Sequence, residues 1–274
     1  MTVGSARDLV PSSVLAAYGV AGSARLLEGG QGSSVRVDGI VLKPGTDPVE
    51  QAWLAEVSAR VVPDGFRLPP PVTAVDGRLV VDGWSGFTWV PGDPVDDDEQ
   101  AAEPWLAVLE SGRAFHRAVV AEVEPPWLST RDHRWAVADR SSWAGALEGT
   151  APEAVLRVLR RLRTLTVEEG LAPQLVHGDQ SGNVLLHPSL PPAIIDLSPY
   201  WRPAAYADAV VVVDALLWWR ADPSLVEAAK PASLSGRHWT SLLARALSFR
   251  LLAEGRPLEA LPSYDVPVDV LEAR

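Results

Sequence analysis

Short apolar runs, separated by turns rich in glycine and aspartate, fill the first 92 residues of the chain. Asp38-Gly39 joins two short β-branched runs and Asp76-Gly77 joins two more, and an Asp-Gly pair in this setting is a strong hairpin signal. Between them, Asp47-Pro48 opens a stretch with apolar side chains at helical spacing, namely Trp53, Leu54, Val57 and Val61. The pattern predicts a small, mainly antiparallel sheet with one helix.

From residue 93 onward, patterns of helix length dominate. The clearest are Pro104 to Val120, Pro152 to Thr166, Tyr206 to Arg220 and Trp239 to Glu254. Between the second and third, residues 175–177, 184–186 and 193–195 are apolar runs too short for helices, and they predict a small β-insert with polar tips. We therefore expect an α+β protein in two parts, residues 1–92 and residues 93–274.

Composition narrows the classes of function. The 274-residue chain carries a formal net charge of −11, which disfavours a nucleic-acid partner. It has no cysteine, so disulfides, thiolate nucleophiles and sulfur-ligated zinc are excluded. The start lacks the features of a signal sequence, and the longest apolar run, Ala209 to Trp219, is too short to span a membrane. We expect a cytoplasmic protein without a membrane partner.

The strongest chemical signal is the segment His177-Gly178-Asp179, followed by Asn183 and then by Asp196 after an apolar run. Two carboxylates and a carboxamide on adjacent turns are hard oxygen ligands of the kind that magnesium prefers. A carboxylate beside such a site can accept a hydroxyl proton during phosphoryl transfer. The alternative is that these residues only form turns, where Asp, Asn and Gly are common.

Lys43 is a second signal, because the chain has only one other lysine, Lys230. It ends a strand-like run, where a compact ammonium would suit phosphate oxygens. The glycine turn of residues 29–34 precedes it and could bring backbone N–H groups to the same phosphates. The alternative is a lysine that happens to lie on an edge strand.

In order, these features resemble the aminoglycoside phosphotransferase and choline kinase group over residues 22–215. The tract at residues 175–203, LVHGDQSGNVLLHPSLPPAIIDLSPYWRP, is more particularly similar to an actinobacterial branch of that group. The resemblance implies a bilobal protein-kinase-like fold. Residues 1–92 would form the nucleotide-binding lobe with its hinge, and residues 93–274 a helical lobe with the catalytic and metal-binding loops.

The resemblance also implies roles for individual residues. Asp179 would be the catalytic base, and His177 would brace its loop. Asn183 and Asp196 would hold Mg²⁺, and Lys43 would contact the α- and β-phosphates of ATP or GTP. Members of the group place four residues between the Asp and the Asn, whereas here three intervene, a difference that Gly182 could absorb.

Further residues would complete the nucleotide site. Glu50 is favoured over Glu56 as the partner of Lys43, because it shares the apolar stripe of its helix; a solvated carboxylate at the helix start is the alternative. The remaining nucleotide contacts are expected from the glycine turn and the hinge, at Gly30, Gly32, Ser33, Phe87, Thr88 and Val90.

Other polar residues are predicted to be structural. The resemblance implies that Asp208 hydrogen-bonds the catalytic loop, and that His116 packs between the lobes. Asp214 interrupts an apolar run, so it must find donors. A satisfied or loop-bracing carboxylate is favoured there over a contact to substrate amines.

Candidate acceptor residues follow Asp196, at Trp201, Trp218 and Arg220, although core packing is the simpler explanation for most of the tryptophans. The prediction is a Mg²⁺-dependent kinase that moves the γ-phosphoryl group of ATP or GTP to a hydroxyl of a small molecule, with an amino sugar or amino alcohol as a candidate acceptor. The alternative is a weak or inactive kinase-like protein that binds a nucleotide or a metabolite.

Overall fold

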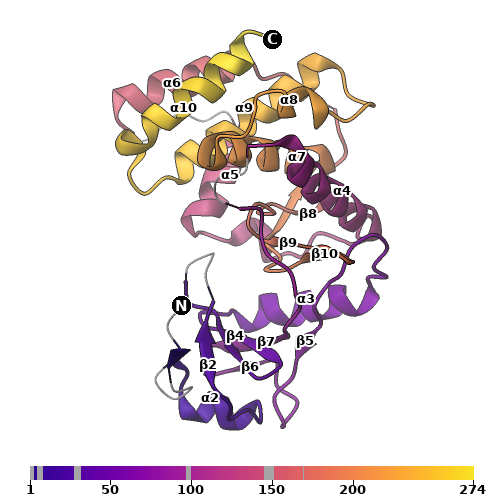
Figure 1. The fold of residues 1–274 in the computed structure, drawn as a ribbon. Helices are drawn as coiled ribbons and strands as arrows, with labels where there is room; N and C mark the ends of the chain where they lie inside the picture. Colours follow the sequence, from indigo (N-terminus) through magenta and orange to yellow (C-terminus); the bar gives the residue numbers. More distant parts are fainter. Residues whose placement is uncertain (1–2, 5–8, 28–31, 97–99, 145–150, 169) are drawn as a thin grey trace. The chain divides into compact units, whose positions relative to one another are not determined.

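The computed structural model describes residues 3–4, 9–27, 32–96, 100–144, 151–168 and 170–274 (Figure 1). The chain divides into two compact units. Unit one comprises residues 1–94 and 182–197, and unit two comprises residues 95–181 and 198–274. The sequence analysis placed residues 182–197 with the helical part, whereas their contacts group them with the sheet.

Unit one is built on an antiparallel sheet in the order β1-β2-β3-β4-β7-β5, with β6 also paired to β7. Its strands are β1 (Val3–Gly4), β2 (Ala24–Leu26), β3 (Val35–Val37), β4 (Ile40–Lys43), β5 (Pro71–Val72), β6 (Val80–Val81) and β7 (Trp84–Thr88). The helices among its described residues include α2 (Ser12–Ala17) and α3 (Pro48–Arg60). The predicted mixed fold with a small antiparallel sheet is confirmed.

One predicted hairpin forms and the other does not. Val37 pairs with Ile40 across Asp38-Gly39. At Asp76-Gly77 a turn forms, but the strands on either side, β5 and β6, each pair with β7 rather than with one another. The hairpin turn lies instead at Asp82-Gly83, where both residues have positive φ, at 49° and 77°. The backbone twist of this turn matches the twist of β6 and β7, the two strands that it joins. Because β7 also pairs with β4 and β5, it is a central strand of the sheet.

A separate β-hairpin in unit one carries the polar tips of the predicted β-insert. It consists of β9 (Val184–His187) and β10 (Leu190–Ile194). Arg67 pairs with β10 through its backbone, accepting from Ile194 N at 2.8 Å and donating to Pro192 O at 2.7 Å. Asp93 exchanges two backbone bonds with Leu186 of β9. Both contacts come from the first 94 residues, which is why the hairpin belongs to unit one.

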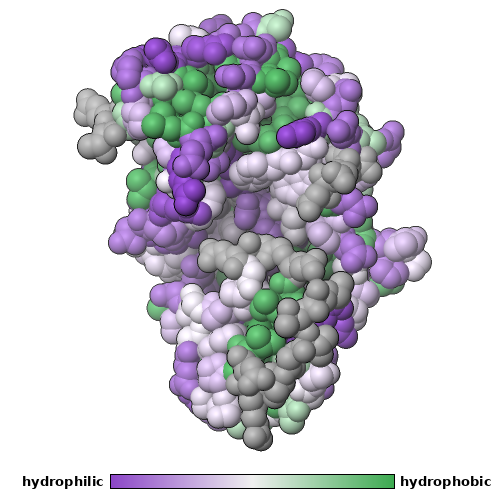
Figure 2. Space-filling model, turned by 60° about the vertical axis from the view of Figure 1, so that its left-hand side comes forward, coloured by the Kyte–Doolittle hydropathy of each residue, from purple (hydrophilic) through white to green (hydrophobic). Residues whose placement is uncertain are grey.

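Unit two is mainly helical, with one strand pair, β8 (Gln174–His177) and β11 (Pro199–Arg202). Its helices are α4 (Ala102–Ala118), α5 (Arg134–Ala144), α6 (Glu153–Thr164), α7 (Ala204–Asp214), α8 (Leu225–Ala228), α9 (Gly236–Ala253) and α10 (Pro257–Glu272). Helix α9 is central and packs against α5, α6, α7 and α10 (Figure 1). Hydrophilic side chains cover much of the face in Figure 2, with hydrophobic patches between them.

Helix α7 shows how an apolar run is terminated. Residues 206–214 are all buried, and a π-helical turn, Ala215–Trp219, continues the helix. Arg220 then adopts a left-handed conformation with φ of 55°, a common way for a helix to end. In the part of the chain that the structure describes, no helix has the length and apolar character needed to cross a membrane.

The contact of α4 with the loop after β8 gives a test of this packing. A Cβ built on Gly112 of α4 would lie 1.8 Å from Oε1 of Gln180, whose side chain is buried. We expect Gly112→Ala to lower the free energy of unfolding by about 1–3 kcal/mol, because a closely packed side chain must move. Urea denaturation measures the change.

Gly236→Ala is the matched control. A Cβ there meets nothing within 4 Å, at the first residue of α9, so it should leave stability unchanged or slightly raised. If Gly112→Ala were as stable as the wild type, the close approach of α4 to Gln180 would be wrong.

Candidate functional site

Lys43 and Asp196 meet on unit one. Lys43 is the last residue of β4, and its Nζ forms an ion pair with Oδ1 of Asp196. The lysine side chain is 21% exposed and the aspartate 46%, so both charges can reach solvent and a ligand. The two residues that the sequence analysis assigned to phosphate and to metal are therefore neighbours.

The β9–β10 hairpin places Asp196 beside Asn183. Ile194 pairs with Val184, and Ile195 N donates to Asn183 O at 2.9 Å. Asn183 and Asp196 thus lie at the same end of the hairpin. Asp196 has φ of +54°, an uncommon conformation for a residue other than glycine. Backbone strain of this kind clusters at functional sites.

Gly182 connects this hairpin end to the preceding loop. Its φ is +78°, and a Cβ placed on it would meet nothing within 4 Å. The local requirement for glycine is therefore conformational. This is the freedom that the sequence analysis invoked for the shortened spacing between Asp179 and Asn183.

The glycine turn is described only in part. Gly30 lies outside the described residues, whereas Gly32 has φ of +65° and Ser33 is exposed. Leu27 N donates to Ser34 O at 2.9 Å, which closes the turn between β2 and β3. The assignment of Gly30, Gly32 and Ser33 to phosphate stays a prediction.

The predicted hinge follows β7. Phe87 is half-buried and pairs with Val41 on one side and Pro71 on the other. Thr88 N donates to Pro70 O at 3.0 Å, so the strand continues to this point before Val90. The contacts of Phe87, Thr88 and Val90 with a base stay predictions.

The two candidate glutamates of α3 differ in exposure. Asp47 caps the helix by accepting from the backbone N of Glu50 at 3.0 Å, and Glu50 is half-buried in the first turn. Glu56 is exposed, and its carboxylate lies 3.9 Å from Arg60. This contrast is in line with the preference for Glu50, whose role stays a prediction.

On unit two, the imidazole of His177 organises the loop that carries Asp179. Nδ1 of the buried His177 accepts from Asp179 N at 3.3 Å and from Ser198 N at 3.2 Å. A ring nitrogen that accepts two N–H groups carries no proton. His177 therefore joins, as a neutral imidazole, the segment that leaves β8 to the segment that enters β11. That this loop is catalytic stays a prediction.

His116 of α4 supports His177 from behind. Its Nε2 accepts from His177 N at 3.1 Å, and its side chain is 2% exposed. Burial lowers the pKa of His116 to about 3, with a further contribution from nearby His177. The backbone oxygen of His116 also accepts from Gln174 Nε2, so His116 joins α4 to β8 within unit two. The packing between lobes that the resemblance implied stays a prediction.

Asp179 contacts a residue that the sequence analysis missed. Nη2 of Arg250 donates to Asp179 Oδ1 at 2.8 Å and to Asp214 Oδ2 at 2.5 Å, and its Nε donates to Asp214 Oδ1 at 2.7 Å. Burial raises the pKa of Asp214 to about 6, an effect that the charge of Arg250 opposes. Asp214 does find donors, as its apolar surroundings required. The only signal in the sequence was this need of Asp214 for donors, which did not indicate that Arg250 supplies them.

Aromatic rings surround the Arg250 guanidinium. The centroids of Trp135, Trp218 and Phe249 lie 5.7, 5.2 and 4.8 Å from its Cζ. Trp218 is 46% exposed, so it extends from this buried cluster to the surface. Of the candidate acceptor residues, Trp218 is therefore connected to Asp179 through Arg250.

The hydrogen bond predicted for Asp208 differs in the structure. Asp208 does not hydrogen-bond the catalytic loop; its Oδ2 accepts from Arg113 Nε at 2.8 Å, which joins α7 to α4. Burial raises the pKa of Asp208 to about 6, against the charge of Arg113. The structural role is retained, but the partner is a helix rather than the loop.

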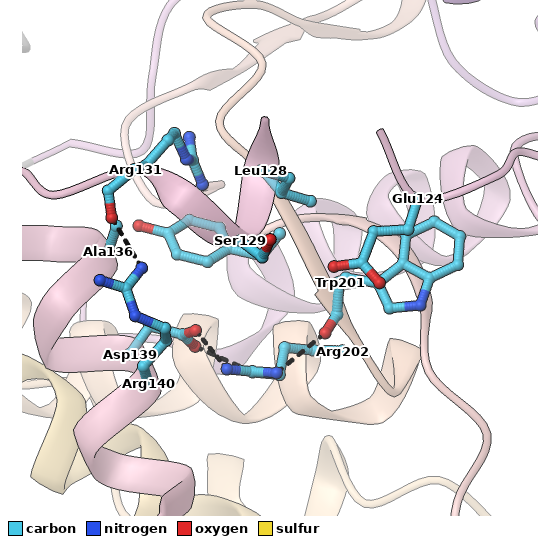
Figure 3. A pocket seen from close by; sticks show the side chains of 10 residues that line it. Glu124, Leu128, Ser129, Arg131, Ala136, Asp139, Arg140, Trp201 and Arg202 are labelled. Atoms are coloured by element: carbon cyan, nitrogen blue, oxygen red, sulfur yellow. Dashed lines mark hydrogen bonds and ion pairs between the residues drawn. The ribbon is translucent and has the colours of Figure 1, made fainter. Parts of the chain in front are cut away.

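Trp201 lies in a different place from Trp218. It lines a cavity of about 100 Å³ together with Tyr200, Arg202 and Asp139 (Figure 3). Arg202 of β11 forms a bidentate ion pair with Asp139 of α5 there. Arg220, the third candidate, is exposed at the end of the π-helical turn. The structure does not gather the three candidate acceptor residues at one described pocket.

Among the described residues, no group of three or more His, Asp or Glu side chains is placed to hold a metal ion. Asn183 and Asp196 nevertheless provide oxygen donors at one end of a hairpin. Such a pair suits an ion that keeps waters and takes phosphate oxygens as its other ligands.

A small antiparallel sheet and a larger helical part are also the architecture of solved phosphotransferases. An aminoglycoside phosphotransferase from Alicyclobacillus acidocaldarius matches with a TM-score of 0.60 at 16% identity, over 97% of this chain and 94% of that one. Spectinomycin phosphotransferase bound to ADP and spectinomycin matches with 0.57 at 13% identity, over 100% and 99%.

A microcompartment-associated aminopropanol kinase matches with a TM-score of 0.56 at 18% identity, over 94% of this chain and 92% of that one. No protein-family model matches the chain. No curated protein matches it in sequence. The chain has the fold of the aminoglycoside phosphotransferases.

The neutral state of His116 predicts a pH dependence of stability. An unfolded histidine has a pKa near 6.5, whereas the folded value is about 3. As the pH falls, His116 therefore takes up a proton in the unfolded state at a higher pH than in the folded state. The free energy of unfolding is unaffected by His116 above about pH 6.5, and it decreases as the pH falls from there toward 3. Between pH 7 and pH 5 the loss is about 2 kcal/mol.

Urea denaturation of the wild type and of His116→Gln at both pH values measures it. The variant is expected to be less stable at pH 7 and to have a smaller pH dependence. Parallel losses in the two proteins would show that His116 is not the group responsible.

Proposed function

We propose that this chain is a phosphotransferase that moves the γ-phosphoryl group of ATP, or of GTP, to a hydroxyl of a small molecule. The observation that carries the proposal is the contact of Lys43 with Asp196, at the end of a hairpin whose other strand begins just after Asn183. A cation that would suit phosphates and a carboxylate that would suit a metal ion thus meet from distant parts of the sequence.

Unit one would bind the nucleotide. The Lys43 ammonium is half-buried at the end of β4, where it can exchange Asp196 for phosphate oxygens. The turn with Gly32 and Ser33 would add backbone N–H groups, and the strand end at Phe87, Thr88 and Val90 would receive the base. Spectinomycin phosphotransferase, a structural neighbour, has been solved with ADP.

The donor set fits Mg²⁺. Asn183 and Asp196 would hold it through their side-chain oxygens, and the ion would spread the negative charge of the transferring phosphoryl group. Lys43, already in contact with Asp196, would keep the phosphates beside these ligands.

Asp179 would act on the acceptor. Its half-exposed carboxylate would accept the hydrogen bond of the acceptor hydroxyl and then its proton, while the hydroxyl oxygen bonds to the γ-phosphorus. The bond from that phosphorus to the β–γ bridging oxygen breaks, and ADP leaves. His177 fixes the loop through the Asp179 N–H, so the carboxylate needs little reorganisation.

An amine-bearing alcohol is the acceptor class we favour. Two structural neighbours are a spectinomycin phosphotransferase and an aminopropanol kinase. The net charge of −11 favours the approach of a cation. Trp218, exposed beside the Asp179 cluster, offers an aromatic face for an amine or a sugar.

A second candidate is a kinase-like protein that binds a nucleotide without turnover. It is favoured by the three residues, rather than four, between Asp179 and Asn183. Turnover separates the two candidates, because both predict nucleotide binding.

Calorimetric titration with ATP tests the nucleotide site. Wild-type binding should strengthen at least tenfold with Mg²⁺, and Asp196→Ala should lose this gain because one ligand is gone. Lys43→Met should weaken binding even without Mg²⁺. Both should unfold near the wild-type urea concentration, because exposed ion pairs contribute only about 0–1 kcal/mol. No ATP binding by the wild type at millimolar concentration would reject both candidates.

Asp179→Asn tests the catalytic assignment. With aminopropanol, spectinomycin, hygromycin B and choline as acceptors, ADP release should fall about 10²–10⁴-fold in this variant, because the proton acceptor is lost. ATP affinity should stay within threefold of the wild type. If the wild type binds Mg·ATP but releases no ADP with any acceptor or with water, the binding protein is the better description.

A further inference from the structure

We propose that Arg250, held by Asp214, is a positioning residue that orients the Asp179 carboxylate for the acceptor hydroxyl. The inference rests on the proposed function, and it assigns work to two residues outside the motifs found in the sequence. Arg250 lies on α9, 71 positions from Asp179, and Asp214 ends α7.

Arg250 and Asp214 are too deeply buried for their contact to be an ordinary ion pair of the protein surface. The side chain of Arg250 is 3% exposed and that of Asp214 is 0% exposed, whereas Asp179 is 43% exposed. A buried charge is costly unless it is paired and hydrogen-bonded. Arg250 therefore needs a carboxylate, and the completely buried Asp214 supplies one.

The distribution of hydrogen bonds shows that Asp214 alone already meets this need. It receives two bonds from the guanidinium, from Nε at 2.7 Å and from Nη2 at 2.5 Å, the bidentate arrangement that suits arginine. The bond from Nη2 to Asp179 is additional, and it reaches a carboxylate on another element. The trio has one positive and two negative charges, and only Asp179 presents its charge toward solvent.

Packing prevents the guanidinium from following Asp179 into other rotamers. The rings of Trp135, Trp218 and Phe249 lie within 6 Å of its Cζ, and α9 is packed on several helices. The Asp214–Arg250 pair is thus a rigid fork. Asp179 has its backbone N–H fixed by His177 and its Oδ1 fixed by Arg250.

Two fixed points on one residue determine where its carboxylate lies. Small misplacements of a reacting group cost large factors in rate, up to about 10²-fold per ångström. Removing Arg250 should therefore reduce kcat and leave ATP affinity unchanged. This split is what a purely structural role for Arg250 would not produce.

The test compares the wild type with Arg250→Gln, Arg250→Lys and the double variant Arg250→Gln/Asp214→Asn. The double variant removes both charges of the buried pair, so it should fold even if the single change leaves Asp214 too unstable. Arg245→Gln is the matched control. Arg245 lies on the same helix and donates to the backbone oxygens of Ser142, Trp143 and Val167.

ATP affinity is measured by titration, and turnover by ADP release with the best acceptor of the panel above or with water. We expect kcat to fall 10- to 100-fold in Arg250→Gln and in the double variant, with ATP affinity within threefold of the wild type. Arg250→Lys should recover part of the loss, because an ammonium can still reach one carboxylate. Arg245→Gln should keep wild-type kcat.

The inference is overturned if either folded variant that lacks Arg250 keeps kcat within twofold of the wild type. It is also overturned if kcat and ATP affinity fall together, or if Arg245→Gln loses as much activity. A wild-type protein that binds ATP without turnover rejects the proposed function itself, and this result is read before any variant is compared.

Discussion

One hydrogen-bond acceptor, the Nδ1 atom of His177, holds two loop segments of unit two together. Nδ1 of His177 accepts from Asp179 N and from Ser198 N, so it joins the point where the chain leaves unit two to the point where it returns. The excursion between them is the hairpin that carries Asn183 and Asp196. This single acceptor must stay unprotonated, and the buried, neutral His116 behind it has the same requirement.

Two arginine–aspartate pairs, each with a buried carboxylate, anchor α7 to its neighbours. Asp208 pairs with Arg113 of α4, and Asp214 pairs with Arg250 of α9. Because a buried ion pair adds little net stability over apolar packing, such pairs are better understood as devices that specify geometry. At Asp208 the geometry concerns helices, because Arg113 also donates to Ala229 O at the end of α8, whereas at Asp214 it extends to the carboxylate of Asp179.

Each unit holds polar residues that are fixed in place and yet accessible. Asp179 is fixed from a buried fork and a buried imidazole, yet its carboxylate is 43% exposed. Asp196 holds a left-handed backbone and pairs with Lys43 at a strand end. Preorganised groups that remain open to a ligand are what phosphoryl transfer requires, because its catalysis depends on positioning and on charge stabilisation.

Local chemistry in the sequence was enough to predict the mixed fold, the Asp38-Gly39 hairpin, the helices α3, α4, α6, α7 and α9, and the need of Asp214 for a donor. It did not predict α2, α5, α8 or α10; in α10, Pro262 and Pro267 argue against a helix when tertiary packing is unknown. It also could not place residues 182–197 with the sheet, nor find Arg250. Those outcomes depend on contacts between segments far apart in the chain, whose partners are chosen by packing and by the burial of charge, and neither leaves a periodic pattern in the sequence.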